Sequence, residues 1–236
     1  MSDSSYQARR SQVESYFDRT AADAWKRLTS DAPVSGIRAT VRAGRDRMRA
    51  MLLDWLPADL TGRRLLDAGC GTGLLAIEAA RRGADVYAVD LSPTLIQHAQ
   101  ERLPADLSGR IEFAVGDMLA PGQGAFDHVV SMDSIIHYEA DDALAVVAGL
   151  VERAHASVLF TFAPRTPALA LMHAVGQLFP RGDRSPAIVP IGERSLRRRI
   201  KESPRFGAWD IARTERVAHG FYTSQALELV RSGEGR

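Results

Sequence analysis

Apolar positions along the chain follow a helical period first and then change to short alternating runs. From residue 13 to residue 28 they recur at helical spacing, and a second helical pattern covers residues 38–55. After Pro57, short apolar runs alternate with further helical patterns. The change predicts an N-terminal helical extension over residues 1–57 and a second domain over residues 58–236.

The second part is predicted to alternate strands with helices. Strands are predicted at residues 64–69, 85–90, 110–117, 126–132, 157–163, 209–217 and 221–230. Helices are predicted at residues 73–82, 92–103, 141–153, 167–179 and 193–202, with a loop at 180–190. This alternation is typical of an α/β domain with a mostly parallel sheet and helices on both faces. The ligand of such a domain lies at the carboxyl ends of the strands.

The most informative segment joins the first predicted strand to its helix. It reads Leu-Leu-Asp-Ala-Gly-Cys-Gly-Thr-Gly over residues 65–73, and its glycines permit a tight turn and close approach of a ligand. A dinucleotide-binding loop would want Gly or Ala where Leu74 stands. A carboxylate two residues before the first glycine would also repel a pyrophosphate, whereas it suits a cationic amino-acid group. The loop residues expected to bind the ligand are Asp67, Ala68, Gly69, Cys70, Gly71 and Gly73.

Two further acidic positions follow the next two predicted strands. Asp90 stands 23 positions after Asp67, where the hydroxyls of a ribose are expected. Asp117 follows the third strand and is suited to accept the adenine amino group, with Met118 packed near the ring. The three elements together resemble the class I S-adenosylmethionine (SAM)-dependent methyltransferases, which implies a Rossmann-like fold, SAM as cofactor and S-adenosylhomocysteine (SAH) as product. The additional residues expected beside SAM are Leu91, Ser92, Gly116, Met132 and Arg42.

Alternatives to parts of this interpretation remain open. An ordinary Rossmann domain that binds another nucleotide would share the glycine-rich loop. Arg42 is expected to contact the SAM carboxylate, and the alternative is that it is an exposed surface arginine. Cys70 is expected to be a small packing residue in the loop, with a nucleophile as the less favoured alternative. Because Cys70 is the only cysteine, an internal disulfide is excluded.

The segment after the fourth predicted strand limits the substrate. It reads Ser-Met-Asp-Ser over residues 131–134 and lacks the Pro-Pro-aromatic sequence of some base-amino methyltransferases. The net charge of +1 likewise gives no field that would attract nucleic acid, so none is expected as a partner. Asp133 alone does not form the oxygen cluster of a hard cation, so no protein-bound metal is expected. His137 is either a general base or an orienting group, or else a structural histidine at a helix start.

Several distinctive segments are spread over residues 11–231. They are Ser-Tyr-Phe at 15–17, Ala-Trp-Lys-Arg-Leu at 24–28, the loop at 66–73, Ser-Ile-Ile-His-Tyr at 134–138, Phe-Thr-Phe-Ala-Pro-Arg-Thr-Pro at 160–167 and Phe-Tyr at 221–222. Together they resemble the magnesium-protoporphyrin IX methyltransferases of chlorophyll and bacteriochlorophyll synthesis. In one departure, Thr29 stands where plant and cyanobacterial members have a tyrosine, so no substrate-facing tyrosine is transferred to it.

The resemblance implies methyl transfer from SAM to one propionate of Mg-protoporphyrin IX, on ring C, with a monomethyl ester as product. We expect His137 to orient the carboxylate or to contact the macrocycle. An apolar helix carrying aromatic residues would cover SAM and porphyrin as a lid, or else simply pack on the core. An arginine after the fifth strand would pair with a propionate, or else be an exposed surface residue. The residues expected to contact the substrate are Tyr16, Phe17, Trp25, Tyr138 and Arg165.

Two other functions remain open at this point. One is a small-molecule O-methyltransferase of the quinone-biosynthetic type, and the other is a SAM-binding regulatory module without catalysis. The resemblance implies the large porphyrin-binding subunit of magnesium chelatase as partner. Low cysteine usage, a polar start and the lack of a long apolar run favour a cytoplasmic protein. The basic cluster at 197–199 with Lys201 fits peripheral membrane contact or a solvated helix face.

Overall fold

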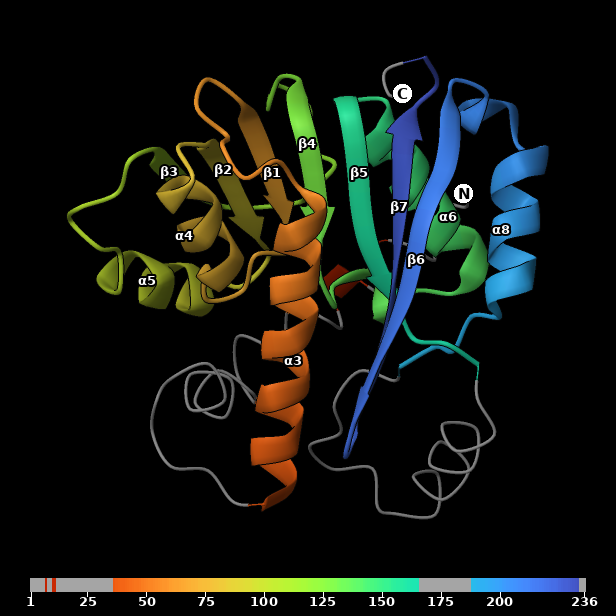
Figure 1. Cartoon of the computed structure of the whole chain (residues 1–236), viewed down its shortest axis with the longest axis horizontal. Coiled ribbons are helices and arrows are strands. Elements are labelled where there is room, and N and C mark those ends of the chain that lie inside the picture. The colour runs from red at the N-terminus through yellow and green to blue at the C-terminus, as the bar shows by residue number, and fades with distance from the viewer. Residues whose placement is uncertain (1–6, 8–9, 12–35, 166–187, 234–236) are drawn as a thin grey trace.

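A seven-stranded sheet forms the centre of the molecule, with the strand order β3-β2-β1-β4-β5-β7-β6 (Figure 1). The computed structural model describes residues 7, 10–11, 36–165 and 188–233. Neighbouring strands from β3 to β5 are parallel, whereas β7 runs antiparallel to both β5 and β6. The strands are β1 (Arg64–Ala68), β2 (Asp85–Asp90), β3 (Arg110–Val115), β4 (Phe126–Ser131), β5 (Ala154–Phe162), β6 (Trp209–His219) and β7 (Tyr222–Arg231). The mostly parallel sheet predicted from the sequence is confirmed.

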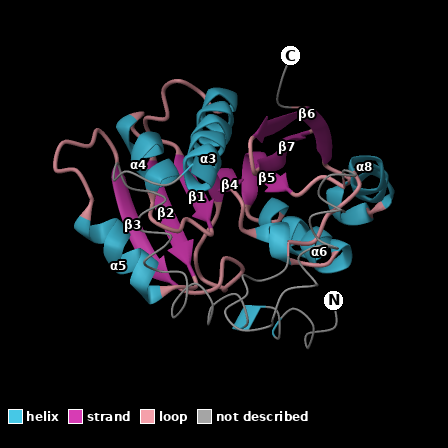
Figure 2. Cartoon of the chain, turned by 90° about the horizontal axis from the view of Figure 1, so that it is seen from below, coloured by secondary structure: helices cyan, strands magenta, loops and turns pink. Residues whose placement is uncertain are grey.

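Helices cover both faces of this sheet (Figure 2). α3 and α4 pack on one face, whereas α6 lies on the other face and contacts α8. Ser92 caps α5 as predicted, because its Oγ accepts a hydrogen bond of 3.3 Å from the Leu95 amide. The helices are α3 (Gly36–Trp55), α4 (Leu74–Arg81), α5 (Pro93–Glu101), α6 (Ala140–Val151) and α8 (Glu193–Glu202), with short 3₁₀ turns η1 (Ile135–His137) and η2 (Pro204–Phe206).

The core consists of two apolar clusters, one on each face of the sheet. Leu65 of β1 belongs to one cluster and its neighbour Leu66 to the other, as expected for a central parallel strand that is covered on both sides. Met48 and Leu52 of α3 are fully buried in the first of these clusters. α3 therefore packs as part of the core, although it falls within the predicted extension; the division at residue 57 stays a prediction.

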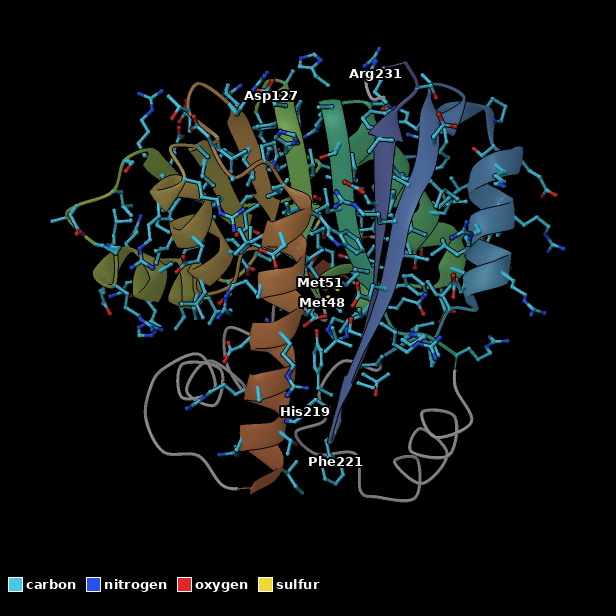
Figure 3. All side chains as sticks on the ribbon, in the orientation of Figure 1. Met48, Met51, Asp127, His219, Phe221 and Arg231 are labelled. Atoms are coloured by element: carbon cyan, nitrogen blue, oxygen red, sulfur yellow. The ribbon has the colours of Figure 1, made fainter. Side chains whose placement is uncertain are left out.

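The hairpin of β6 and β7 projects past the carboxyl edge of the parallel strands, beside the N-terminal half of α3. Figure 3 labels His219 and Phe221 at its tip, far from Asp127 and Arg231 at the opposite edge. The Phe221 amide donates to the Thr40 Oγ1 of α3 over 3.4 Å. The tip is thus attached to α3 at the edge where the parallel strands end.

Some predicted elements lie outside the described residues. These are the helix at 13–28, the helix at 167–179 and most of the loop at 180–190. Among the helices of residues 36–165 and 188–233, none combines the length and apolar character needed to cross a bilayer.

Candidate active site

A cleft of about 1060 Å³, counting its open mouth, lies at the carboxyl ends of β1, β2 and β4. One wall comes from the loops after β1 and β2, and the other from α3 and the turn after β4. The described residues that line it are Arg42, Arg45, Asp46, Arg49, Asp67, Gly69, Cys70, Gly71, Thr72, Leu74, Leu75, Val89, Asp90, Leu91, Leu95, Gly116, Met118, Met132, Asp133, Ser134, His137 and Tyr138.

The glycine-rich loop lies tightly against the turn after β4. Gly69 has a φ of 81°, and a Cβ there would lie 2.4 Å from the Cβ of Ser134. The amides of Gly69 and Cys70 both donate to the Val89 carbonyl, at 2.9 and 3.0 Å. Only glycine combines this backbone conformation with this contact, so Gly69 is required where the loop meets that turn.

Asp90 at the end of β2 holds this loop in place. Its Oδ2 accepts a hydrogen bond of 2.8 Å from the Gly71 amide, and its Oδ1 accepts one of 3.0 Å from the Ser92 amide. Burial raises the pKa of Asp90. A carboxylate offers about four acceptor positions, so Asp90 keeps acceptor capacity beyond these backbone bonds. The arrangement fits the two hydroxyls of a ribose.

Asp67 is a buried carboxyl group with an unsatisfied oxygen. Asp67 is among the lining residues of the cleft, and its buried Oδ2 has no hydrogen-bond partner among the described residues. Burial, together with the charge of Asp90, raises the pKa of Asp67 to about 7. A buried acceptor without a donor is costly. An ammonium group would supply the donor, and the positive charge of a sulfonium would offset that of the ionised carboxylate. The residues present therefore fit the cationic end of SAM.

The predicted adenine end is only partly within the cleft. Gly116 and Met118 line it, whereas Asp117 is not among the described lining residues. One Asp117 oxygen accepts from the Leu119 amide at 2.8 Å, and the other lies 3.4 Å from the Arg10 guanidinium. An adenine contact of Asp117 therefore stays a prediction.

The remaining predicted cofactor residues divide in the same way. Three of these residues, Ala68, Gly73 and Ser92, are not among the lining residues. The Ala68 carbonyl accepts hydrogen bonds from Ser131 and Ser134 at 3.0 and 3.1 Å. Gly73 precedes α4, and Ser92 is buried as the N-cap of α5. The predicted cofactor residues that do line the cleft are Asp67, Gly69, Cys70, Gly71, Asp90, Leu91, Gly116, Met118, Met132 and Arg42.

His137 and Tyr138 lie in and just after η1, in the segment that follows β4. Both are buried, with 4% and 2% of their surface exposed, and both line the cleft. Arg165 is exposed, lies outside the described lining, and its amide donates to the Ile191 carbonyl. The predicted substrate contacts Tyr16, Phe17 and Trp25 lie outside the described residues.

Several cleft residues carry no sequence-based prediction as ligand contacts. Arg45 and Arg49 come from one face of α3, Thr72 from the glycine-rich loop, and Asp133 and Ser134 from the turn after β4. Asp133 has a φ of 53°, which is rare outside glycine. The signal that would have indicated Asp133 is its position just after β4, because the residues that follow the nearby strands β1 and β2 are predicted to contact the ligand.

The chain matches a known protein over almost the full length of both. It is 51% identical to the magnesium-protoporphyrin O-methyltransferase of Rhodobacter capsulatus over 226 residues, which cover 95% of this chain and 98% of that protein. The chain belongs to the magnesium-protoporphyrin O-methyltransferase family. The family model "Magnesium-protoporphyrin IX methyltransferase C-terminus" matches residues 131–231, and a general methyltransferase-domain model matches residues 65–154.

Solved structures of a protein from the same family share this fold. The magnesium protoporphyrin IX methyltransferase (ChlM) of Synechocystis PCC 6803 with bound SAH superposes with a TM-score of 0.83, at 31% identity, over 95% of this chain and 100% of that chain. The same protein with bound SAM gives a TM-score of 0.78, at 29% identity, over 95% and 97% of the two chains. The class I fold predicted from the sequence is thereby confirmed for this member of the family.

Proposed function

We propose that this chain transfers a methyl group from SAM to one propionate carboxylate of Mg-protoporphyrin IX and releases the monomethyl ester and SAH. The observation that carries the proposal is the near full-length identity of 51% with an enzyme of that name. The cleft agrees with it, because Asp67 and Asp90 suit SAM on one wall while His137 and Tyr138 face the same space from the other. The quinone-type alternative has no comparable full-length support.

The reaction asks for orientation more than for a strong base. SAM supplies an electrophilic methyl group on sulfur. A propionate has a reference pKa of roughly 4.3, so it is already ionised at neutral pH. The chain must hold a carboxylate oxygen in line with the bond from sulfur to methyl and exclude water from it. We assign the orienting role to His137, because it is buried in the cleft wall and comes from a turn that follows β4 directly.

Variants of His137 test this role. His137→Ala is expected to lower turnover at saturating SAM and porphyrin by about ten-fold or more, since orientation of reacting groups dominates such a step. His137→Gln, which keeps hydrogen-bonding capacity, is expected to retain more activity than the alanine variant. Near-normal turnover of both variants would show that His137 neither orients the substrate nor acts as a base.

The substrate side of the site is proposed to include the aromatic residues of the N-terminal extension. We propose that the N-terminal segment forms a lid over SAM and the porphyrin, that its residues Tyr16, Phe17 and Trp25 contact the macrocycle, and that Arg165 pairs with a propionate. Trp25→Ala is then expected to raise the KM for porphyrin several-fold, with an unchanged dissociation constant for SAM. Equal weakening of SAM and porphyrin would contradict a lid that acts on the substrate.

The cellular setting is also proposed. A cytoplasmic location and transfer of substrate from the large porphyrin-binding subunit of magnesium chelatase fit the family, with no nucleic acid and no protein-bound metal taking part. Within the described part of the chain, no group of three or more metal-ligating side chains occurs; the absence of a metal stays a prediction. On α8, Arg197 and Arg199 are engaged by Glu193 and Asp141, which leaves the exposed Arg198 and Lys201 as candidates for contact with an anionic membrane. Sedimentation with vesicles containing anionic lipid, with an Arg198→Gln, Lys201→Gln variant as control, tests that contact.

The activity itself is tested by methyl transfer from labelled SAM. Mg-protoporphyrin IX and metal-free protoporphyrin IX are supplied in parallel, and the porphyrin products are separated by chromatography. The proposal predicts a labelled monomethyl ester with the magnesium form. SAM binding without ester formation from either porphyrin would refute the proposed substrate and would direct the search to quinones and other small acids.

A further inference from the structure

The carboxylate of Asp133 is the meeting point of three separate elements at the rim of the cleft. Its Oδ2 accepts from Arg45 of α3 at 2.7 Å, and its Oδ1 accepts from Thr161 of β5 at 3.1 Å. From β7, Ser224 donates to Oδ1 at 3.0 Å, and the Tyr222 hydroxyl lies 3.1 and 3.0 Å from the two oxygens. Only 4% of the Asp133 side chain is exposed.

This bonding pattern defines what Asp133 can do. Donors from the protein occupy both of its oxygens, so the group is already saturated as an acceptor. A carboxylate in that state is poorly placed to take a proton from a substrate or to bind a metal ion. Its own amide also donates to the Thr161 Oγ1 at 2.7 Å, which fixes the backbone at its unusual positive φ. Asp133 therefore acts through the groups that it holds.

The packing beside Asp133 joins α3 firmly to β7. Tyr222 is buried, and a Cβ at Gly44 of α3 would lie 2.5 Å from its ring. Burial, with the nearby Asp133 carboxylate, raises the pKa of Tyr222 well above its ordinary value, so the hydroxyl stays a donor. Arg45 is the residue after Gly44, and this contact sets where its side chain enters the cleft wall.

The charge of Arg45 matters because the cleft must receive a cation. Three arginines of α3 line the cleft, and one of them, Arg49, forms an ion pair of 2.7 Å with Asp46 in the same lining. Asp67 and Asp90 line the same cleft. An uncompensated guanidinium in this wall would repel the sulfonium of SAM. It would have little effect on SAH, whose sulfur is neutral.

We propose that Asp133 is a positioning residue that holds Arg45 in the cleft wall and cancels its charge, so that the cleft accepts the sulfonium of SAM. The inference rests on the proposed use of SAM. It does not depend on the porphyrin, so failure of the proposed substrate and failure of this inference are distinguishable. The ratio of SAM affinity to SAH affinity is its specific readout, because general damage to the cleft would weaken both ligands alike.

The test measures the dissociation constants of SAM and SAH by calorimetry for the full-length protein without porphyrin. Asp133→Asn removes the negative charge that Asp133 places beside Arg45, and the SAM to SAH affinity ratio is expected to fall at least about three-fold. Arg45→Gln leaves the anion uncompensated, and the ratio is expected to rise by a similar factor. The double variant is expected to return the ratio close to that of the wild type.

Asp127→Asn is the matched control. Asp127 lies near the start of β4, the strand that Asp133 follows, and accepts two hydrogen bonds, from the Arg64 amide at 2.8 Å and from Arg63 at 3.2 Å, at the opposite edge of the sheet (Figure 3). The SAM to SAH affinity ratio of the Asp127→Asn variant is expected to equal that of the wild type. If Asp133→Asn does not fold, Arg45→Gln alone still decides, because an unchanged ratio in that variant refutes the proposal. Equal weakening of SAM and SAH in the folded single variants, or shifts in the same direction, also overturns it.

Discussion

The two walls of the cleft are built in different ways. The wall of the glycine-rich loop comes from segments close in the sequence, since Gly71 and Asp90 are 19 positions apart and are joined by one hydrogen bond. The opposite wall joins Asp133 to Arg45 and Tyr222, which are 88 and 89 positions away from it. The first wall therefore follows from local strand-to-loop patterns, whereas the second exists only once the sheet has formed. This difference explains why the sequence could indicate residues that line the first wall, whereas it could not indicate the Asp133 network.

The largest expected effect concerns the locally built wall. Asp90→Asn removes an acceptor for the ribose and weakens the bond that holds Gly71, so the affinity for SAM is expected to fall about 30-fold or more. SAH should be weakened to the same degree, because both ligands carry the ribose. Asp85→Asn, at the other end of β2 and paired with Arg110, is the control and should leave both affinities unchanged. Unaltered SAM binding in Asp90→Asn would remove the ribose assignment.

The second prediction concerns the pH dependence of the same wall. Since the pKa of Asp67 is raised to about 7, its carboxyl is largely protonated below that pH and ionised above it. A cationic ligand prefers the ionised form, whose fraction falls from about 0.9 at pH 8 to about 0.1 at pH 6, so the affinity for SAM is expected to fall about ten-fold over that range. Titration calorimetry at several pH values measures this, and Asp67→Asn should bind weakly with a nearly flat profile.

The ligand-free protein should respond in the opposite sense. A carboxyl group whose pKa is raised by folding holds its proton more tightly in the folded state. Its contribution to stability is therefore present at low pH and is lost as the pH rises from about 4 through about 7. Asp67→Asn removes the buried charge, so the variant without ligand is expected to melt at a higher temperature than the wild type at pH 8. A lower melting temperature would contradict the cause given for the raised pKa.

The smallest expected effect concerns the wall built by long-range contacts. Gly44→Ala would place a Cβ 2.5 Å from the Tyr222 ring, an overpacking cost of about 1–3 kcal/mol, against a gain of about 1 kcal/mol in helix propensity. We expect a net loss near 1 kcal/mol, which corresponds to a fall in melting temperature of about 2–4 °C. Gly36→Ala, at the start of the same helix with nothing within 4 Å, should show no such fall. Equal melting of both variants would mean that α3 is not held by this contact.

The fold could be predicted closely because each strand carries its own signal. β2 and α8 agree with their predicted bounds residue for residue, and the β6–β7 pair closes the sheet as expected. β3 ends at Val115, two residues before its predicted end, because Gly116 and Asp117 leave the sheet to form the turn beside the cleft. β5 begins at Ala154, three residues earlier than predicted, since its pairing with β4 extends to Phe126.

The site was predictable only where a single segment carries the chemistry. Asp67 and Asp90 stand at or beside strand ends, and the roles predicted for them follow from that position. Asp133 was considered at the sequence level only as a metal ligand. Its four donors come from α3, β5 and β7, and no local pattern indicates that they converge. The residues that would complete the substrate side, Tyr16, Phe17 and Trp25, lie outside the described ranges and remain predictions.

A crystal structure with SAH and Mg-protoporphyrin IX bound together would test the account most directly. It should place the ribose hydroxyls on Asp90, the amino group of SAH near the unsatisfied oxygen of Asp67, and one propionate between His137 and the sulfur. Arg45 should remain on Asp133 in that complex. A porphyrin bound outside the cleft, or a propionate directed away from the sulfur of SAH, would contradict the account.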